Sequence, residues 1–119
     1  MKASATTAFE YRVAQHGGAI VVAFTGTFDS KSIPKLEELL RQLKQRPEQN
    51  IILGFEAVST VLTYAALSQA TKFLRARKKN VVLTGLKSDV KVMMIQTGVA
   101  QTTEMQPTVF DALKSLERK

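Results

Sequence analysis

Cysteine is missing from the 119 residues, and histidine occurs only once, as His16. A chain without cysteine can form neither a disulfide framework nor a thiolate metal site. His16 lies in a Gln15-His16-Gly17-Gly18 turn without an evident partner. The sequence also lacks a His/Asp/Glu set at metal-ligand spacing and any nucleotide-loop or nucleophile-elbow motif. We therefore expect no metal site, no cofactor and no catalytic residue, and we do not expect an enzyme.

Long hydrophobic runs are also absent. No apolar run approaches the roughly 20 residues that a membrane span needs, and residues 1–8 lack the apolar core of a signal peptide. We expect a cytoplasmic protein with a flexible N-terminus over residues 1–8 and one domain over residues 9–119.

Acidic residues are scarce, since 17 basic residues face 10 acidic ones and give a net charge of +7. Much of the excess lies between positions 72 and 91, where Asp89 is the only acidic residue. The basic residues there are Lys72, Arg75, Arg77, Lys78, Lys79, Lys87 and Lys91. Such a basic face could bind an anionic ligand or nucleic acid. The simpler interpretation is that the cations at 75–79 close a helix, where they meet the negative end of its dipole.

The stretch from Ile51 to Leu74 organises the chain. Residues 51–55 are almost continuously apolar, which is typical of a strand covered on both faces. From Ala65 onward the apolar residues recur at helical spacing. Between them we expect a hinge over residues 58–64 that leads into a helix N-terminus, where a phosphorylated hydroxyl would be favoured.

The remaining segments predict further elements around this unit. Residues 9–13 and 19–24 read as an antiparallel hairpin, with residues 25–30 breaking the second strand. Helices are expected after Ser30 or Ser32, after Ser88 or Asp89, and from Pro107. A buried strand is expected over 80–84 and a short edge strand within 99–105. The fold class is α/β, with a four- to five-stranded mixed sheet (an N-terminal antiparallel hairpin, then parallel strands) and about four helices.

Five features together resemble the STAS domain, the module of anti-sigma-factor antagonists and of sulphate-transporter tails. They are the hairpin, the strand exit at 25–29, the strand at 51–53 running into 58–61, the strand at 81–83, and the hydrophobic-x-x-Thr-Gly segment within 92–99. The resemblance covers nearly the whole chain from about residue 9. It implies a non-catalytic domain that binds a protein partner through the loop and helix after the third strand.

The resemblance also shows where this sequence departs from the family. In regulatory members the loop reads Asp-Ser-Ser-Gly, and a serine/threonine kinase that is also the anti-sigma factor phosphorylates the hydroxyl there. Aligned without gaps, these four residues fall on Leu62, Thr63, Tyr64 and Ala65, and the usual acidic residue at the third strand falls on Gly54. The usual serine switch is therefore degenerate.

Two interpretations of Thr63 stay open. It is either a phosphoacceptor or partner-contacting hydroxyl, or only the cap of the following helix. Asp29 likewise either belongs to the partner surface or caps the helix beside it, and Tyr64 could anchor an interface. The expected partner interface consists of Asp29, Ser59, Thr60, Leu62, Thr63, Tyr64 and Ala65.

The leading hypothesis is a bacterial signalling and transcription-regulating adaptor that binds an anti-sigma factor or serine/threonine kinase, without the usual serine phospho-switch. The alternatives are a small STAS subunit on the ATPase of a lipid-type ABC transporter, and anion or nucleic-acid binding through the basic face. Edge strands of such sheets can pair, so a homodimer is a further hypothesis.

Overall fold

The computed structural model describes residues 8–61, 64–96 and 103–117. Two strands come first, β1 (Glu10–His16) and β2 (Ala19–Phe28), followed by a short 3₁₀ turn, η1 (Ser30–Ser32). Strands and helices then alternate: α1 (Ile33–Lys44), β3 (Asn50–Val61), α2 (Tyr64–Ala76), β4 (Asn80–Thr84), α3 (Ser88–Gln96), β5 (Glu104–Gln106) and α5 (Val109–Glu117). None of the described helices is long and apolar enough to cross a membrane.

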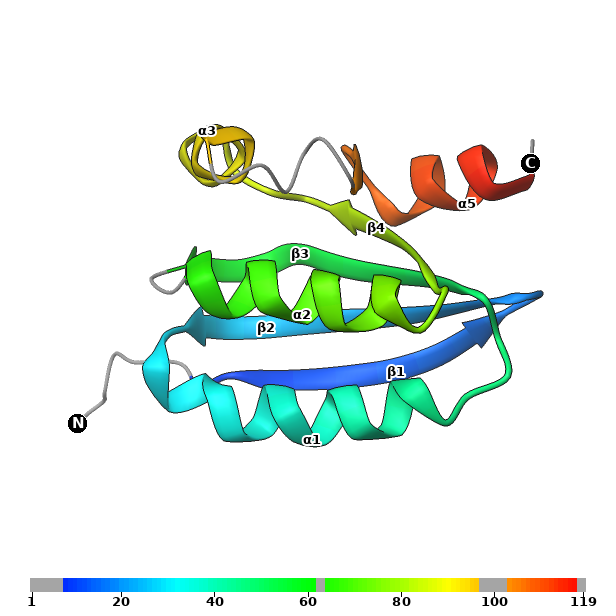
Figure 1. The fold of residues 1–119 in the computed structure, drawn as a ribbon. Helices are drawn as coiled ribbons and strands as arrows, with labels where there is room; N and C mark the ends of the chain where they lie inside the picture. Colours follow the sequence, from blue (N-terminus) through cyan, green and yellow to red (C-terminus); the bar gives the residue numbers. More distant parts are fainter. Residues whose placement is uncertain (1–7, 62–63, 97–102, 118–119) are drawn as a thin grey trace.

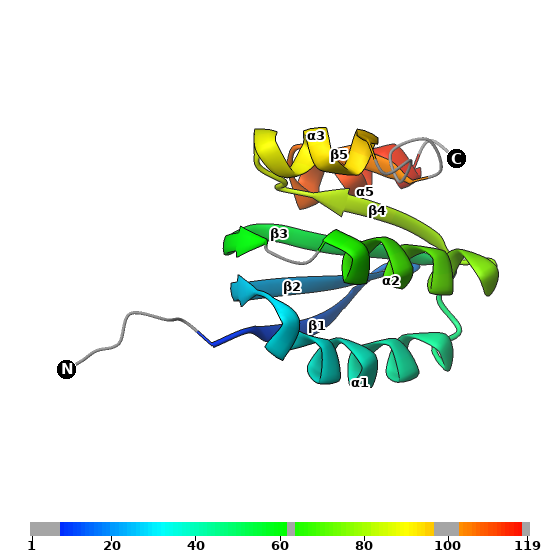
Figure 2. The same cartoon turned by 60° about the vertical axis from the view of Figure 1, so that its left-hand side comes forward.

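The described strands form one five-stranded sheet in the order β1-β2-β3-β4-β5. β1 pairs antiparallel with β2, and the other pairs are parallel. Figures 1 and 2 show α1 and α2 running side by side over the sheet, with α5 near β4 and β5. The predicted α/β class, hairpin and mixed sheet are confirmed.

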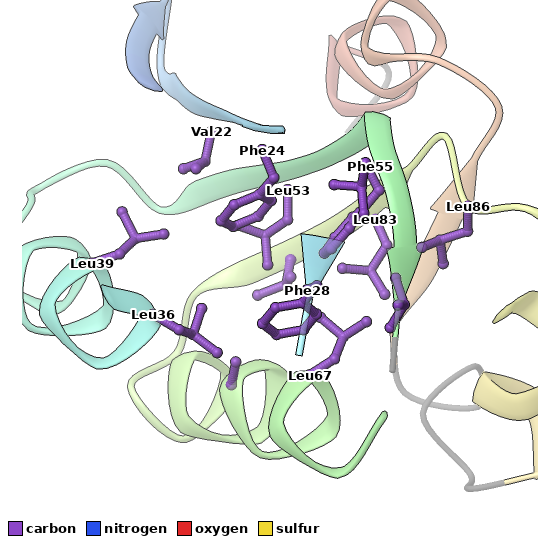
Figure 3. Packing of buried hydrophobic residues seen from close by; sticks show 14 of the residues in the cluster. Val22, Phe24, Phe28, Leu36, Leu39, Leu53, Phe55, Leu67, Leu83 and Leu86 are labelled. Atoms are coloured by element: carbon purple, nitrogen blue, oxygen red, sulfur yellow. The ribbon is translucent and has the colours of Figure 1, made fainter. Parts of the chain in front are cut away.

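Alternation along the strands places apolar side chains on both faces of the sheet. Ile51 and Leu53 belong to the larger core cluster, which α1, α2 and α3 cover. Figure 3 shows this packing around Phe24 and Phe28. Ile52 points the other way, into a smaller cluster with Ala112 of α5. The continuous apolar run at 51–53 is therefore buried from two sides, as the sequence predicts.

Four phenylalanine rings fill the core near the carboxyl ends of β2 and β3. Phe9 and Phe28 have ring centroids 5.2 Å apart, and Phe24 and Phe55 have centroids 5.0 Å apart. Aromatic pairs at this spacing add to the free energy of burial alone. This cluster lies directly beneath the end of the sheet from which the chain enters α1 and α2.

Two expected strand ends are wrong. β2 continues through Phe28 instead of breaking at residue 25, and β3 continues to Val61, so residues 58–61 are strand and not hinge. The reason is an irregular register between β2 and β3, with shifts between Ala23 and Thr25 and between Gly26 and Thr27. Gly26 has a φ of 90°, which glycine adopts readily. A bulge at this glycine lets pairing resume beyond it.

The other boundaries agree more closely. The hairpin turn is the two-residue Gly17-Gly18 connection, with Gly17 at a φ of 58°. The short edge strand is β5 at Glu104–Gln106, slightly later than expected. The expected flexible N-terminus lies outside the described residues, apart from Ala8.

Candidate functional site

The candidate site lies where β2 and β3 end side by side. Thr27 pairs with Thr60, and Phe28 pairs with Val61. Asp29 therefore follows β2 at the edge of the sheet where β3 also ends, and α2 begins at Tyr64. This edge collects the carboxyl ends of parallel strands, where α/β proteins commonly place their functional groups. Figure 1 shows both strands ending on the side where α1 and α2 begin.

The structure brings several predicted site residues together there. Ser59 and Thr60 lie near the end of β3, and Tyr64 and Ala65 are the first two residues of α2. Thr60 and Ala65 are exposed. Leu62 and Thr63 lie outside the described residues, so the two interpretations of Thr63 both stay predictions.

Asp29 caps the turn that follows β2. Its Oδ1 accepts a hydrogen bond from the backbone N–H of Lys31 at 2.9 Å, and its own N–H donates to Ser32 Oγ at 3.0 Å. Ser32 Oγ in turn donates to the carbonyl of Thr27 at 3.1 Å. This reciprocal pattern is a capping box. The expected capping role of Asp29 is confirmed, and it fixes the direction in which the chain leaves the site for α1.

Lys87, which the sequence assigns to the basic face and not to the partner interface, lies beside the site. Its Nζ donates to the carbonyl of Val58 at 3.3 Å, and it lines a small hollow of about 90 Å³ with Thr60 and Asp89. Only the pairing of β3 with β4 brings residue 87 here, so no local sequence signal marks it.

A larger hollow opens from the same end between α1 and α2. It has a volume of about 520 Å³, and its lining is mostly apolar, from Ile33 and Ala65 at the site to Leu40 and Phe73 farther along the helices. A third hollow of about 340 Å³ lies on the other side of Asp29, beside Lys31. The exposed edge is thus flanked by three concave surfaces of different polarity.

The basic residues do not form one continuous patch. Arg75, Arg77 and Lys78 precede β4, whereas Lys87 and Lys91 follow it, so the two groups lie at opposite ends of this strand. Figure 1 shows the end of α2 and the start of α3 on opposite sides of the molecule.

Two of these cations serve the fold. Lys79 is buried, and its Nζ donates to the carbonyls of Arg46 at 2.6 Å and Glu48 at 2.8 Å. The Arg77 guanidinium lies 3.7 Å from the centroid of the Phe73 ring, at the end of α2. For Arg77 and Lys79, these contacts favour the interpretation that the cations at 75–79 close a helix over the interpretation that they form a binding face.

Among the described residues, no group of three histidine or carboxylate side chains is close enough to hold a metal ion. The Asp29 carboxylate at the end of β2 is engaged in the capping box.

Comparison with known proteins assigns the class. The STAS domain family model matches residues 10–112, so the chain belongs to the STAS family. The match spans both the hairpin and the β3–α2 unit on which the candidate site stands. A comparison with curated proteins gives no match.

Solved structures share the fold. An anti-sigma factor antagonist from Mycobacterium paratuberculosis is 20% identical, with a TM-score of 0.75 over 92% of this chain and 95% of that one. RsbS from Moorella thermoacetica is 22% identical, with a TM-score of 0.73 over 92% of this chain and 98% of that one. A chain of the stressosome, a signal integration and transduction hub, is 19% identical, with a TM-score of 0.68 over 91% of this chain and 100% of that one.

Proposed function

We propose that this protein is a non-catalytic regulatory adaptor that binds an anti-sigma factor or a related serine/threonine kinase in bacterial signalling. The observation that supports the proposal is the pairing of Phe28 with Val61, which brings the carboxyl ends of β2 and β3 to one edge of the sheet. Membership of the STAS family supports it, as do structural neighbours described as an anti-sigma factor antagonist and as part of the stressosome.

The proposed interface consists of the residues named from the sequence, with Lys87 added at its margin. A capping box fixes the Asp29 turn, and β-sheet pairing fixes Thr60. The partner therefore meets a surface whose backbone is already ordered, which lowers the entropy cost of binding. Ala65 has a small, exposed side chain in the first turn of α2 and lets the partner approach the helix closely.

We further propose that binding is constitutive. Tyr64 and Leu62 stand where the family pattern has the phosphorylated serine and its preceding acidic residue. A serine/threonine kinase would not use tyrosine in the same geometry. Thr63 then acts as a helix cap or as an uncharged contact, and partner choice is not switched by a phosphate there.

The test is an affinity pull-down from native lysate, with intact-mass analysis of the bait. Wild type, Thr63→Ala and Thr63→Glu should capture the same kinase-like partner equally, with no added mass on the bait. Capture by wild type that is lost with Thr63→Glu, together with a phosphate on Thr63, would replace constitutive binding by a rewired phospho-switch.

A second pair of variants tests the surface itself. Ala65→Arg adds a long charged side chain at the start of α2 and should abolish capture, whereas Gln45→Arg adds the same group at the far end of α1 and should not. Equal capture by both variants would contradict the proposed interface. Recovery of a transporter ATPase in place of a kinase would favour the ABC-transporter alternative.

A further inference from the structure

Among the described residues, no strand pairs with the outer edge of β1. β1 is the first strand of the sheet in the described part of the chain, and there it pairs with β2 alone, through seven residues in continuous register from Glu10 to His16. The opposite edge, β5, has only three residues. Figure 2 shows β1 as the outermost strand at its side of the sheet.

The hairpin geometry determines which backbone groups point outward from β1. His16 and Ala19 flank the two-residue Gly17-Gly18 turn, so they form a hydrogen-bonded pair. Hydrogen-bonded pairs alternate along an antiparallel ladder, so Ala14 and Arg12 also bond to β2. The N–H and C=O groups of the residues between them point away from the sheet. These residues are Tyr11, Val13 and Gln15.

Contacts from α1 leave this edge open. Lys35 Nζ meets the Glu10 carboxylate at 2.9 Å, and the Tyr11 phenol donates to Glu38 at 2.6 Å. Both contacts use side chains of β1. Within the described part of the chain, no hydrogen bond from α1 reaches the outward N–H or C=O groups of β1.

β1 lacks two of the features that usually protect an edge strand, proline and a bulge. It contains no proline, its register with β2 has no bulge, and a valine, Val13, lies at its centre with 40% of its surface exposed. Natural edge strands are usually blunted by proline, by bulges or by charged side chains, and of these β1 has only the charged Glu10 and Arg12. An edge of this length with neither proline nor a bulge can add a further strand.

We propose that two copies of this chain pair through β1, antiparallel and centred on Val13. In this register Val13 faces Val13 of the second copy and Tyr11 faces Gln15, and each such pair exchanges two backbone hydrogen bonds. All of the outward-pointing groups are then used, and two five-stranded sheets become one continuous sheet.

Side-chain pairing favours this register over its neighbours. Centred on Val13, Arg12 lies opposite Ala14 of the second copy, so no two like charges are opposed. The next competent register on one side places Arg12 opposite Arg12, and opposed like charges destabilise strand pairing. The one on the other side places Tyr11 opposite Gly17 of the turn, so fewer of the outward-pointing groups of β1 are paired.

This dimer would leave the candidate site accessible. The proposed interface lies at the carboxyl ends of β2 and β3, whereas the pairing runs along the outer side of β1. A symmetric dimer would thus present two copies of the proposed interface. The inference therefore does not depend on the proposed function.

Sedimentation velocity over a concentration series tests the proposal. Wild type should show a monomer–dimer equilibrium. Val13→Pro removes one outward N–H while leaving every bond to β2 intact, as edge prolines do, and should raise the dimer dissociation constant at least roughly tenfold. Val13→Thr keeps the N–H and β propensity and should stay within a few-fold of wild type. A monomeric wild type at all concentrations, or a Val13→Pro protein as dimeric as wild type, would overturn the proposal.

Amide hydrogen exchange on the wild-type protein gives a second test without substitution. The amides of Arg12, Ala14 and His16 should be protected at every concentration, because they bond to β2. Those of Tyr11, Val13 and Gln15 should gain protection only as concentration rises. Outward amides whose exchange rates do not change with concentration would refute pairing through β1, even if a dimer forms elsewhere.

Discussion

Glu56 shows how one side chain can join three elements. Its Oε1 accepts a hydrogen bond from the Thr84 hydroxyl at 2.9 Å, and its Oε2 accepts one from the backbone N–H of Val109 at 3.0 Å. The glycines around it leave the necessary space. A Cβ on Gly54 would lie 3.0 Å from Glu56 Oε1, and one on Gly85 would lie 2.6 Å from the Glu56 backbone nitrogen.

Replacing Glu56 by alanine should lower the free energy of unfolding by about 1–3 kcal/mol. The fully buried Thr84 hydroxyl would lose its acceptor, and an unpaired buried polar group costs about this much. Adding Thr84→Val should recover part of the loss, because both partners are then apolar. Urea unfolding of both single variants and the double variant measures the coupling.

The control for this cycle is Glu37→Ala, which removes an exposed carboxylate from α1 and should change stability by no more than about 0.5 kcal/mol. If Glu56→Ala unfolded at the same urea concentration as Glu37→Ala, the three-element contact would contribute nothing to stability.

Lys78 has an unfavourable backbone conformation at the end of α2. Its φ is 64°, and the Lys79 N–H donates to the carbonyl of Leu74 at 3.2 Å, while the Lys78 N–H donates to that of Arg75 at 2.9 Å. This is the Schellman pattern, whose left-handed position usually holds glycine. Lys78→Gly should therefore raise the free energy of unfolding by about 1 kcal/mol.

Lys78→Ala is the matched control, because it removes the same charge and keeps the Cβ that disfavours a positive φ. Chemical denaturation should show a gain for glycine and none for alanine. A gain of equal size in both variants would point to charge repulsion near the helix end as the cause.

At the scale of elements, α5 has a small and separate packing surface. Ala112 is its fully buried residue and meets Val21, Ile52 and Val82 of the sheet. The larger cluster on the opposite face contains no residue of α5. The attachment of α5 to the sheet is therefore more sensitive to change than that of α1 or α2.

Ala112→Leu should overfill this surface and cost about 1–3 kcal/mol. Amide exchange should show α5 losing protection while the α2 amides keep theirs, because local opening follows local packing. Lys114→Leu, on the exposed side of the same helix, should leave α5 protected. Uniform loss of protection across α2 and α5 would show that the helix does not open on its own.

The elements differed in how well the sequence predicted them. β-branched runs identified the central strands because burial on both faces leaves no polar alternation. The ends of β2 and β3 were missed because Gly26 and Glu56 resemble strand breakers when read alone. In the fold, a bulge accommodates Gly26, and Glu56 finds partners in Thr84 and α5, so pairing continues.

For the molecule as a whole, the order of elements was enough to predict the mixed sheet, whereas the site residues stay a prediction. In a parallel strand–helix unit, the first turn of the helix, here with Ala65, lies near the carboxyl edge of the sheet. Asp29 lies at the same edge because Phe28 of β2 pairs with Val61 of β3. The position of Lys87 beside Val58 could not be predicted, because it depends on the pairing of β3 with β4. The separation of the basic residues by β4 has the same origin.

The distribution of aromatic residues also provides an optical signal. The chain has no tryptophan and only two tyrosines. The Tyr11 hydroxyl donates a hydrogen bond to Glu38, and this bond raises the pKa of Tyr11 above its ordinary value. Tyr64, the other tyrosine, is the first residue of α2. In a Tyr11→Phe protein, all tyrosine emission would come from the proposed interface. Such a protein carries its own label-free fluorescent reporter at the position where a partner is expected to bind.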